Sequence, residues 1–215
     1  SEAPYIQRNI DATLAAYGLD KTEITAYNAK TDANAGQLKA DAESTASIRL
    51  LDPSLVTPTF RQLQQNRQYY NFSSQLNVDR YQVSGTSRDT VIAVRELNLA
   101  GLSQDQHTWV NDHTVYTHGY GVVSAYGNTV ASGGYPSFWE GGIPSKGDLG
   151  KYEPRIYFGQ SSPSYSIVGG KDNGSPRELD YHDDESKTGQ VNTTFTGNGG
   201  PSVSNPLNRV LYAAK

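Results

Sequence analysis

Bulky side chains fall on every second position in several short runs of the second half of the sequence, and this feature limits the possible folds most strongly. Turn residues separate the runs, which centre on Ile156/Phe158, Tyr165/Ile167, Leu179/Tyr181 and Val191/Thr193/Phe195. Because successive side chains of a strand point to opposite faces, such alternation gives each run one bulky face. The pattern predicts an antiparallel sheet made from these runs.

Helical spacing marks the start of the sequence. Ile6, Ile10 and Leu14 form one apolar stripe along an amphipathic helix expected over Tyr5–Tyr17, and Gly18 ends that helix. We expect the stripe to be buried by docking of the helix onto the sheet. The alternative is a linker helix whose stripe is exposed in this chain and contacts a membrane part of a longer protein.

The middle of the sequence combines further helix signals with strand patterns. Thr57-Pro58 has the form of an N-cap followed by a first-turn proline, so a second helix is expected there. Strands are expected from Leu76 to Leu97, with a break near Asp79-Arg80. A capping-box pattern at Ser103–Gln106 predicts a helix that runs to His118. Because helices come early and strands late, we predict a mixed α+β fold with a largely antiparallel sheet.

The chain is long enough for one large domain, and we predict a single domain over residues 1–215. Glycine and proline are frequent in the stretch 128–150, which is a candidate long loop or subdomain joint. A short strand is expected at 24–27, and a surface excursion or a weak helix at 31–46. A helix that starts at Pro206 still carries its apolar stripe near Lys215, so we expect it to continue in a longer protein.

Two absences and the charge balance restrict the class of protein. The sequence has no cysteine, which excludes thiol nucleophiles, thiolate metal sites and disulfides, and which suits an exported bacterial domain. It also has no methionine, so a processed or partial chain is expected. The net charge of -4 gives no basic face for nucleic acid. The most apolar run, Thr90–Val94, is far shorter than the ~20 residues of a membrane-spanning helix.

Histidines and acidic residues do not combine into a metal site. His113 and His118 are five positions apart, so their side chains would diverge on a helix. His107 would share a face with His118 but lie too far along the axis for one ion. The stretch 32–43 matches a calcium-binding loop only in part. We predict no metal and no cofactor.

Aromatic residues in the stretch 128–150 are the candidate contact surface. Tyr135, Phe138 and Trp139 lie beside Glu140, and exposed aromatic side chains can bind a sugar or a protein partner. Anchoring in the core is the other interpretation of these three residues. The nearby stretch 142–147 has two residues before its serine, where a nucleophile elbow has one, and we identify no catalytic residue.

Several stretches, taken in order, resemble one bacterial family. They are YIQRNIDATLAAYGL, LLDPSLVTPTFRQLQQNRQYYNF, RELNLAGL, TWVNDHTVYTHGYGVVSAYGN, PRIYFG, ELDY and NTTFTG. From about Pro4 onward the chain is similar to the bacterial membrane proteins grouped as uncharacterised protein family 0182 (UPF0182). The resemblance implies a multi-pass protein with spans near its N-terminus, of which this chain would be part of the extracytoplasmic region. It implies no reaction, ligand or catalytic residue.

These observations favour a non-catalytic extracytoplasmic domain that binds a cell-envelope component or another part of its own protein. The expected location is the cell membrane, with this region outside the cytoplasm. The alternative is an envelope hydrolase acting on glycan or peptide, with acids such as Glu140, Asp183 or Glu185. A cleft with two opposed carboxylates, or a nucleophile paired with a base, would favour the hydrolase.

Overall fold

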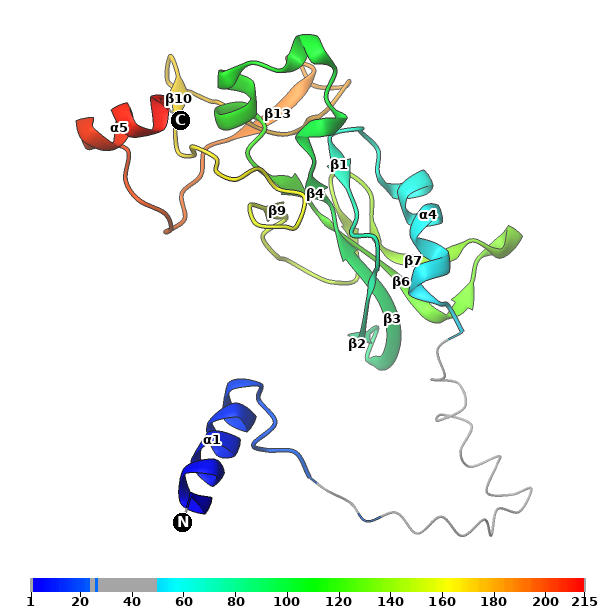
Figure 1. Ribbon diagram of the computed structural model, residues 1–215. Helices are drawn as coiled ribbons and strands as arrows, with labels where there is room; N and C mark the ends of the chain where they lie inside the picture. The colour runs from blue at the N-terminus through cyan, green and yellow to red at the C-terminus, as the bar shows by residue number, and fades with distance from the viewer. Residues whose placement is uncertain (1, 24–25, 27–49, 215) are drawn as a thin grey trace. The chain divides into compact units, whose positions relative to one another are not determined.

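The computed structural model describes residues 2–23, 26 and 50–214 (Figure 1). The chain separates into two compact units, residues 1–42 and 43–215. The strand expected at 24–27, the excursion expected at 31–46 and the partial calcium match lie, apart from residue 26, outside the described residues. The stretch 128–150 belongs to the second unit, where it carries the end of one strand and two further strands.

Helix α1 (Ala3–Ala16) is the regular element described in the first unit. Pro4 lies in its first turn, where the missing N–H costs no helical hydrogen bond. The expected apolar stripe is present, but Ile6, Ile10 and Leu14 are 55 %, 46 % and 37 % exposed. The first unit by itself therefore leaves this stripe uncovered, and its docking onto the sheet stays a prediction.

Five strands form the main sheet of the second unit, in the order β2-β3-β6-β7-β8 (Figure 1). Their bounds are β2 Asn77–Val83, β3 Thr86–Val94, β6 Val122–Val130, β7 Pro136–Gly141 and β8 Lys146–Gly147. Every neighbouring pair in this sheet is antiparallel. The predicted α+β fold with a largely antiparallel sheet is confirmed.

The hairpin of β2 and β3 turns at Ser84-Gly85, where φ is 50° and 77°. Two central residues with positive φ match the right-handed twist of the flanking strands. The pairing then runs without a shift from Asn77↔Ile92 to Val83↔Thr86, so the break expected near Asp79-Arg80 is wrong. β2 is an edge strand, and Val78 is 41 % exposed, so the apolar pattern can change face there without a bulge.

Helix α4 (Pro53–Gln64) covers part of the main sheet. Its N-cap is Asp52 instead of the predicted Thr57, because the Asp52 side chain accepts a hydrogen bond from the Ser54 N–H at 2.9 Å. Pro58 therefore lies inside the helix. Phe60 is fully buried and packs with buried side chains of the sheet and its flanks, namely Phe72, Leu76, Val91, Ala93, Val123 and Ala125.

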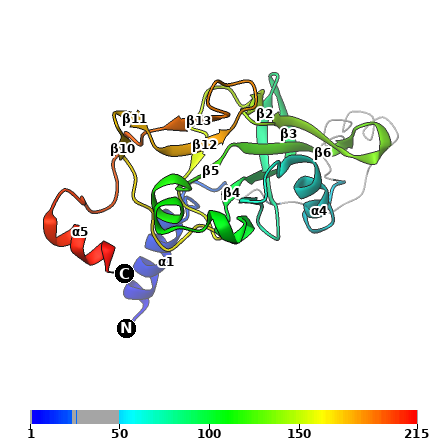
Figure 2. The same ribbon diagram turned by 90° about the horizontal axis from the view of Figure 1, so that it is seen from above.

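The other strands form four two-stranded pairs. The strands are β1 (Tyr70–Asn71) with β4 (Glu96–Leu97), β5 (Gly119–Tyr120) with β9 (Arg155–Ile156), β10 (Lys171–Asp172) with β11 (Ser175–Pro176), and β12 (Glu178–His182) with β13 (Gln190–Thr193). Members of β1, β4, β5 and β12 contribute to a second core that is rich in tyrosine. The buried members of this core are Tyr69, Tyr70, Leu97, Leu102, Tyr116, Tyr120 and Leu179. Helix α5 (Pro206–Ala213) leaves the unit at the end that carries β10 and β11 (Figure 2).

The segment predicted as one helix up to His118 is broken in the structure. It contains a 3-10 turn (Gln104–Gln106) and a π-helical turn (Asn111–Val115). The backbone is extended between them at His107, where φ is -76° and ψ is 100°. The capping contact is present, since the Ser103 N–H donates to the Gln106 side-chain oxygen at 3.3 Å. The cap therefore starts a single turn, and the longer helix expected here is wrong.

Candidate functional site

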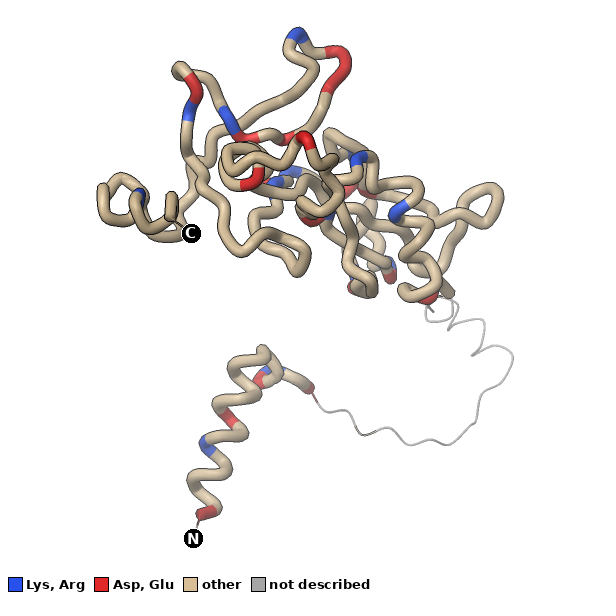
Figure 3. Tube along the Cα trace, turned by 45° about the horizontal axis from the view of Figure 1, so that its top comes forward, with Lys and Arg blue, Asp and Glu red and all other residues tan. Residues whose placement is uncertain are grey.

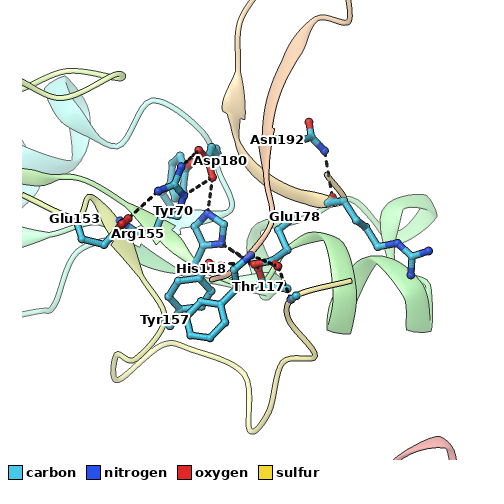
Figure 4. A network of polar contacts seen from close by, with 12 residues as sticks. Tyr70, Thr117, His118, Glu153, Arg155, Tyr157, Glu178, Asp180 and Asn192 are labelled. Carbon is cyan, nitrogen blue, oxygen red and sulfur yellow. Dashed lines mark hydrogen bonds and ion pairs between the residues drawn. The ribbon is translucent and has the colours of Figure 1, made fainter. Parts of the chain in front are cut away.

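The most conspicuous polar cluster is a buried network between β9, β12 and the start of β5 (Figure 4). Asp180 of β12 accepts a two-pronged contact from Arg155 of β9, with Nε to Oδ1 at 2.9 Å and Nη2 to Oδ2 at 2.7 Å. His118, which directly precedes β5, places Nε2 at 3.1 Å from the same Oδ1. The Asp180 carboxylate thus has two partners, and its bidentate pair with the Arg155 guanidinium is of the strong, charge-assisted kind.

Glu178 is the second acid of the network, and all of its oxygens are occupied. Its Oε1 accepts from the backbone N–H groups of Gly169 at 2.8 Å and Phe195 at 2.9 Å. Its Oε2 accepts from the Tyr157 hydroxyl at 3.0 Å and from the Thr117 hydroxyl at 3.3 Å. Burial and the adjacent Glu178 charge raise the pKa of Tyr157 well above its ordinary value, so the phenol stays protonated and donates.

The network therefore links β12 to β9 and to His118, and the carboxylates of Glu178 and Asp180 are occupied by partners within the protein. Burial alone would raise the pKa of Asp180, but the hydrogen bonds from His118 and Arg155 outweigh it and hold that pKa below 3.8. A carboxylate with these partners is ionised and occupied. The sequence carried a signal for the pair, because Glu178 and Asp180 alternate with Leu179 and Tyr181, which places both acids on one face of a strand.

A separate cavity of about 360 Å³ lies near the C-terminal end of α4. It is called the Arg67 cavity below. Its lining comes from the end of α4 and the residues after it, from the β7–β8 turn and from β12, and consists of Leu63, Gln64, Asn66, Arg67, Tyr70, Gly142, Ile143, Tyr181 and His182. None of these residues is acidic, so the polar groups around the cavity are amides, a guanidinium, hydroxyls and an imidazole.

Gln64 is held in one orientation by its neighbours. Its side-chain Oε1 accepts from Arg95 Nη2 at 2.9 Å and from the Gly142 N–H at 3.0 Å. Two donors on this atom identify it as the oxygen, so Nε2 remains as the donor of the amide. Arg95 is fully buried, and its Nε also donates to the Gln64 backbone oxygen at 2.5 Å. Burial lowers the pKa of Arg95 to about 10, which still leaves the guanidinium charged at neutral pH.

His182 supplies the imidazole of the polar lining. Its Nδ1 lies 2.8 Å from the hydroxyl of Tyr69, whose pKa burial raises to about 12, so that the phenol is protonated. A phenol that donates to Nδ1 leaves the proton of the neutral imidazole on Nε2. Burial, followed by the charge of Arg67, lowers the pKa of His182, while Asp184 acts in the opposite direction. His182 is therefore neutral at pH 7.

The structure separates the three aromatic residues proposed as a contact surface. Tyr135 is 50 % exposed in the turn before β7, Phe138 packs against Phe60 with ring centres 4.9 Å apart, and Trp139 is 7 % exposed. Phe138 and Trp139 are consecutive in a strand, so they lie on opposite faces of the sheet. Core anchoring describes these two, and a contact role for Tyr135 stays a prediction.

The remaining histidines have separate partners. His107 contacts Asp112 at 3.1 Å, and His113 stacks on Tyr165 with ring centres 4.2 Å apart. His118 belongs to the buried network. Among the residues that the structure describes, no group of three or more His, Asp or Glu side chains could hold a metal ion.

The acids considered for a hydrolase are not gathered around the Arg67 cavity. Glu140 is 2 % exposed and accepts from the Leu149 N–H at 3.2 Å and the Tyr152 hydroxyl at 3.3 Å. Asp183 accepts from the N–H of Glu185 at 3.0 Å, so these two belong to a local turn after β12. The opposed pair of carboxylates required by a glycosidase is therefore not built from these residues at the cavity.

Comparison with known proteins places the chain in one family. The family model described as an uncharacterised protein family, UPF0182, matches residues 1–215. The chain belongs to the UPF0182 family. A UPF0182 protein of Paenarthrobacter aurescens is 58 % identical over 217 residues, and one of Tropheryma whipplei is 56 % identical over 214 residues. Each match covers 100 % of this chain and 22 % of the relative, so the chain spans about a fifth of the UPF0182 proteins it matches. No solved structure matches the chain.

Proposed function

We propose that this part of the UPF0182 protein is a non-catalytic binding domain, with the Arg67 cavity as its ligand site. One observation carries the proposal: hydrogen-bond donors line the cavity without a carboxylate, whereas the acids of the buried network are occupied by partners within it. Acid–base chemistry requires groups that are free to exchange a proton with a substrate. Binding requires only placed donors and a hollow, which the cavity supplies.

The ligand would be a cell-envelope component or another part of the same protein. We further propose that the domain lies outside the cytoplasm in a multi-pass membrane protein. The lack of cysteine in 215 residues and the family resemblance support this location. No helix within the described residues is long and apolar enough to cross a membrane.

A ligand screen observed by NMR tests the binding role. The imidazole signals of His182, assigned with His182→Asn, should shift when a cavity ligand from envelope fractions is added to the 215-residue chain. The signals of His118 should not shift, because that ring is buried in the network. Shifts at His118 alone, or turnover of glycan or peptide substrates that survives blocking of the cavity, would overturn the proposal and favour a hydrolase.

Cysteine labelling tests the location. Because this part of the chain has no cysteine, a single Ser132→Cys substitution in the turn before β7 adds one thiol to it. In cells that make the full-length protein, a membrane-impermeant maleimide should label this variant more strongly than the parent. Labelling only after the cells are lysed would place the domain inside the cytoplasm.

A further inference from the structure

We propose that the Arg67 cavity binds a compact oxyanion, with a phosphate group as the chemistry that fits it best. This inference rests on the proposed binding role and names the ligand class of the same site. It depends on three donor groups that reach the cavity from different parts of the chain: the guanidinium of Arg67, the side-chain amide of Gln64 and the imidazole of His182.

Arg67 supplies a positive charge that is not paired with an acid. Among residues 2–23, 26 and 50–214, none of the ion pairs involves Arg67. Its charge nevertheless acts on its neighbours: it opposes the larger effect of burial on the pKa of Tyr69, and it adds to the effect of burial that lowers the pKa of His182. Figure 3 shows that basic and acidic residues are both spread along the second unit. The lining of the Arg67 cavity differs from this pattern, because it contains a basic residue and no acidic one. A planar guanidinium is well suited to the oxygens of a phosphate or carboxylate.

Arg95 adds a second positive charge, which is held against the lining residue Gln64. It is fully buried, and in the described part of the chain its hydrogen bonds go to Gln64 and to the Tyr120 backbone oxygen. The charge of Glu140 acts on it from a distance, without an ion pair. Arg95 also neutralises the backbone oxygen of Gln64 at the end of α4, where the partial negative charge of a helix terminus would otherwise repel an anion.

His182 and Gln64 provide directed donors beside these charges. With its Nδ1 facing the Tyr69 hydroxyl, the neutral His182 ring presents Nε2–H as a donor. The Gln64 amide is fixed by Arg95 and Gly142, so its NH₂ group is already oriented before any ligand arrives. Donors held in place cost little to order on binding, which favours affinity. The cavity volume of about 360 Å³ accommodates a phosphate and a small group attached to it.

Titration with inorganic phosphate tests this inference. We expect saturable shifts of the His182 imidazole signals and a rise in the pKa of His182, because an adjacent anion favours the imidazolium. Arg67→Gln should weaken binding roughly tenfold or more, as expected for loss of a charged hydrogen bond. Arg88→Gln is the matched control, since Arg88 is exposed and lies over Tyr126 outside the cavity. Equal affinities for the two variants, or shifts that never saturate, would overturn the inference.

Two further measurements distinguish a lipid headgroup from a free phosphate, and failure of the oxyanion inference from failure of the binding role. Co-sedimentation with phosphatidylglycerol vesicles that exceeds binding to phosphatidylcholine vesicles, and is lost in Arg67→Gln, would assign the phosphate to a lipid headgroup. Binding of free phosphate without such co-sedimentation would assign it to a soluble ligand, and both results support the inference. Neutral saccharides that shift the His182 signals independently of Arg67, with no effect of phosphate, would reject the oxyanion and keep the binding role. If none of these ligands shifts the His182 signals, both the oxyanion inference and the binding role are rejected.

Discussion

Asp180 and His118 are 62 positions apart in the sequence, yet Asp180 Oδ1 lies 3.1 Å from His118 Nε2. The exposed fractions of the two side chains are 3 % and 0 %. Because Arg155 contacts the same carboxylate, three separate segments meet at one buried acid. The contact fastens β12 to the strand pair of β5 and β9.

Removing the charge of Asp180 should destabilise the protein strongly. We expect Asp180→Asn to lower the free energy of unfolding by about 3–5 kcal/mol, because Arg155 would lose its buried carboxylate and keep only the exposed Glu153 as a partner. Urea denaturation followed by circular dichroism measures the change. Asp89→Asn is the matched control, since Asp89 pairs with the 61 % exposed Arg80. That pair should contribute no more than about 1 kcal/mol. Equal losses in both variants would show that the network has no special role.

The contribution of Asp180 should disappear in acid. Its folded-state pKa lies below the ordinary 3.8, so its stabilisation is fully present above pH 3.8 and is lost as the pH falls through the lower, folded-state value. The difference in unfolding free energy between the parent and Asp180→Asn should therefore narrow between pH 5 and pH 2. Urea melts across this range check the trend. A difference that stays constant, or widens in acid, would contradict the assigned contacts.

Gly119 should not tolerate a side chain. A Cβ at this position would lie 1.9 Å from the Arg95 backbone oxygen, and a backbone atom cannot move aside as a flexible side chain can. We expect Gly119→Ala to lower the free energy of unfolding by about 1–3 kcal/mol. Gly170→Ala is the control, because a Cβ there meets nothing within 4 Å. Its effect should stay within about 0.5 kcal/mol. Thermal melts of the two variants that coincide would refute the close approach of β5 to Arg95.

The exposed stripe of α1 should accept a charge. Within its own unit Ile10 is 46 % exposed, and with no further cover Ile10→Asp should change the melting temperature little, by about as much as Asp11→Ala. Val123→Asp provides the opposite case, because Val123 is fully buried in the main core. It should forfeit roughly 1.5–3 kcal/mol of burial and add the desolvation cost of a charge. A sharp loss of stability in Ile10→Asp would mean that the stripe is covered in solution.

The sequence by itself determined the elements whose signals are local. Helix α5 begins at Pro206, and Asn205 caps it through a hydrogen bond to the Leu207 N–H at 2.9 Å, a contact set within three residues. The alternation at Leu179/Tyr181 and Val191/Thr193 likewise became β12 and β13. These features follow from backbone geometry and neighbouring side chains, so no remote part of the chain is needed to predict them.

Only the tertiary structure decided which stretches of alternating side chains pair as strands and which charged side chains are buried. Tyr165 and Ile167 alternate like a strand, yet the Ile167 N–H donates to the His113 backbone oxygen at 2.7 Å and no strand forms there. Arg95, Gln64 and His182 gave no signal as a group, because their positions depend on contacts up to 113 residues apart, such as Tyr69 with His182. A strand requires a neighbour to complete its hydrogen bonds, and a buried charge requires a distant partner to offset its desolvation. Both come from parts of the chain that local spacing does not record.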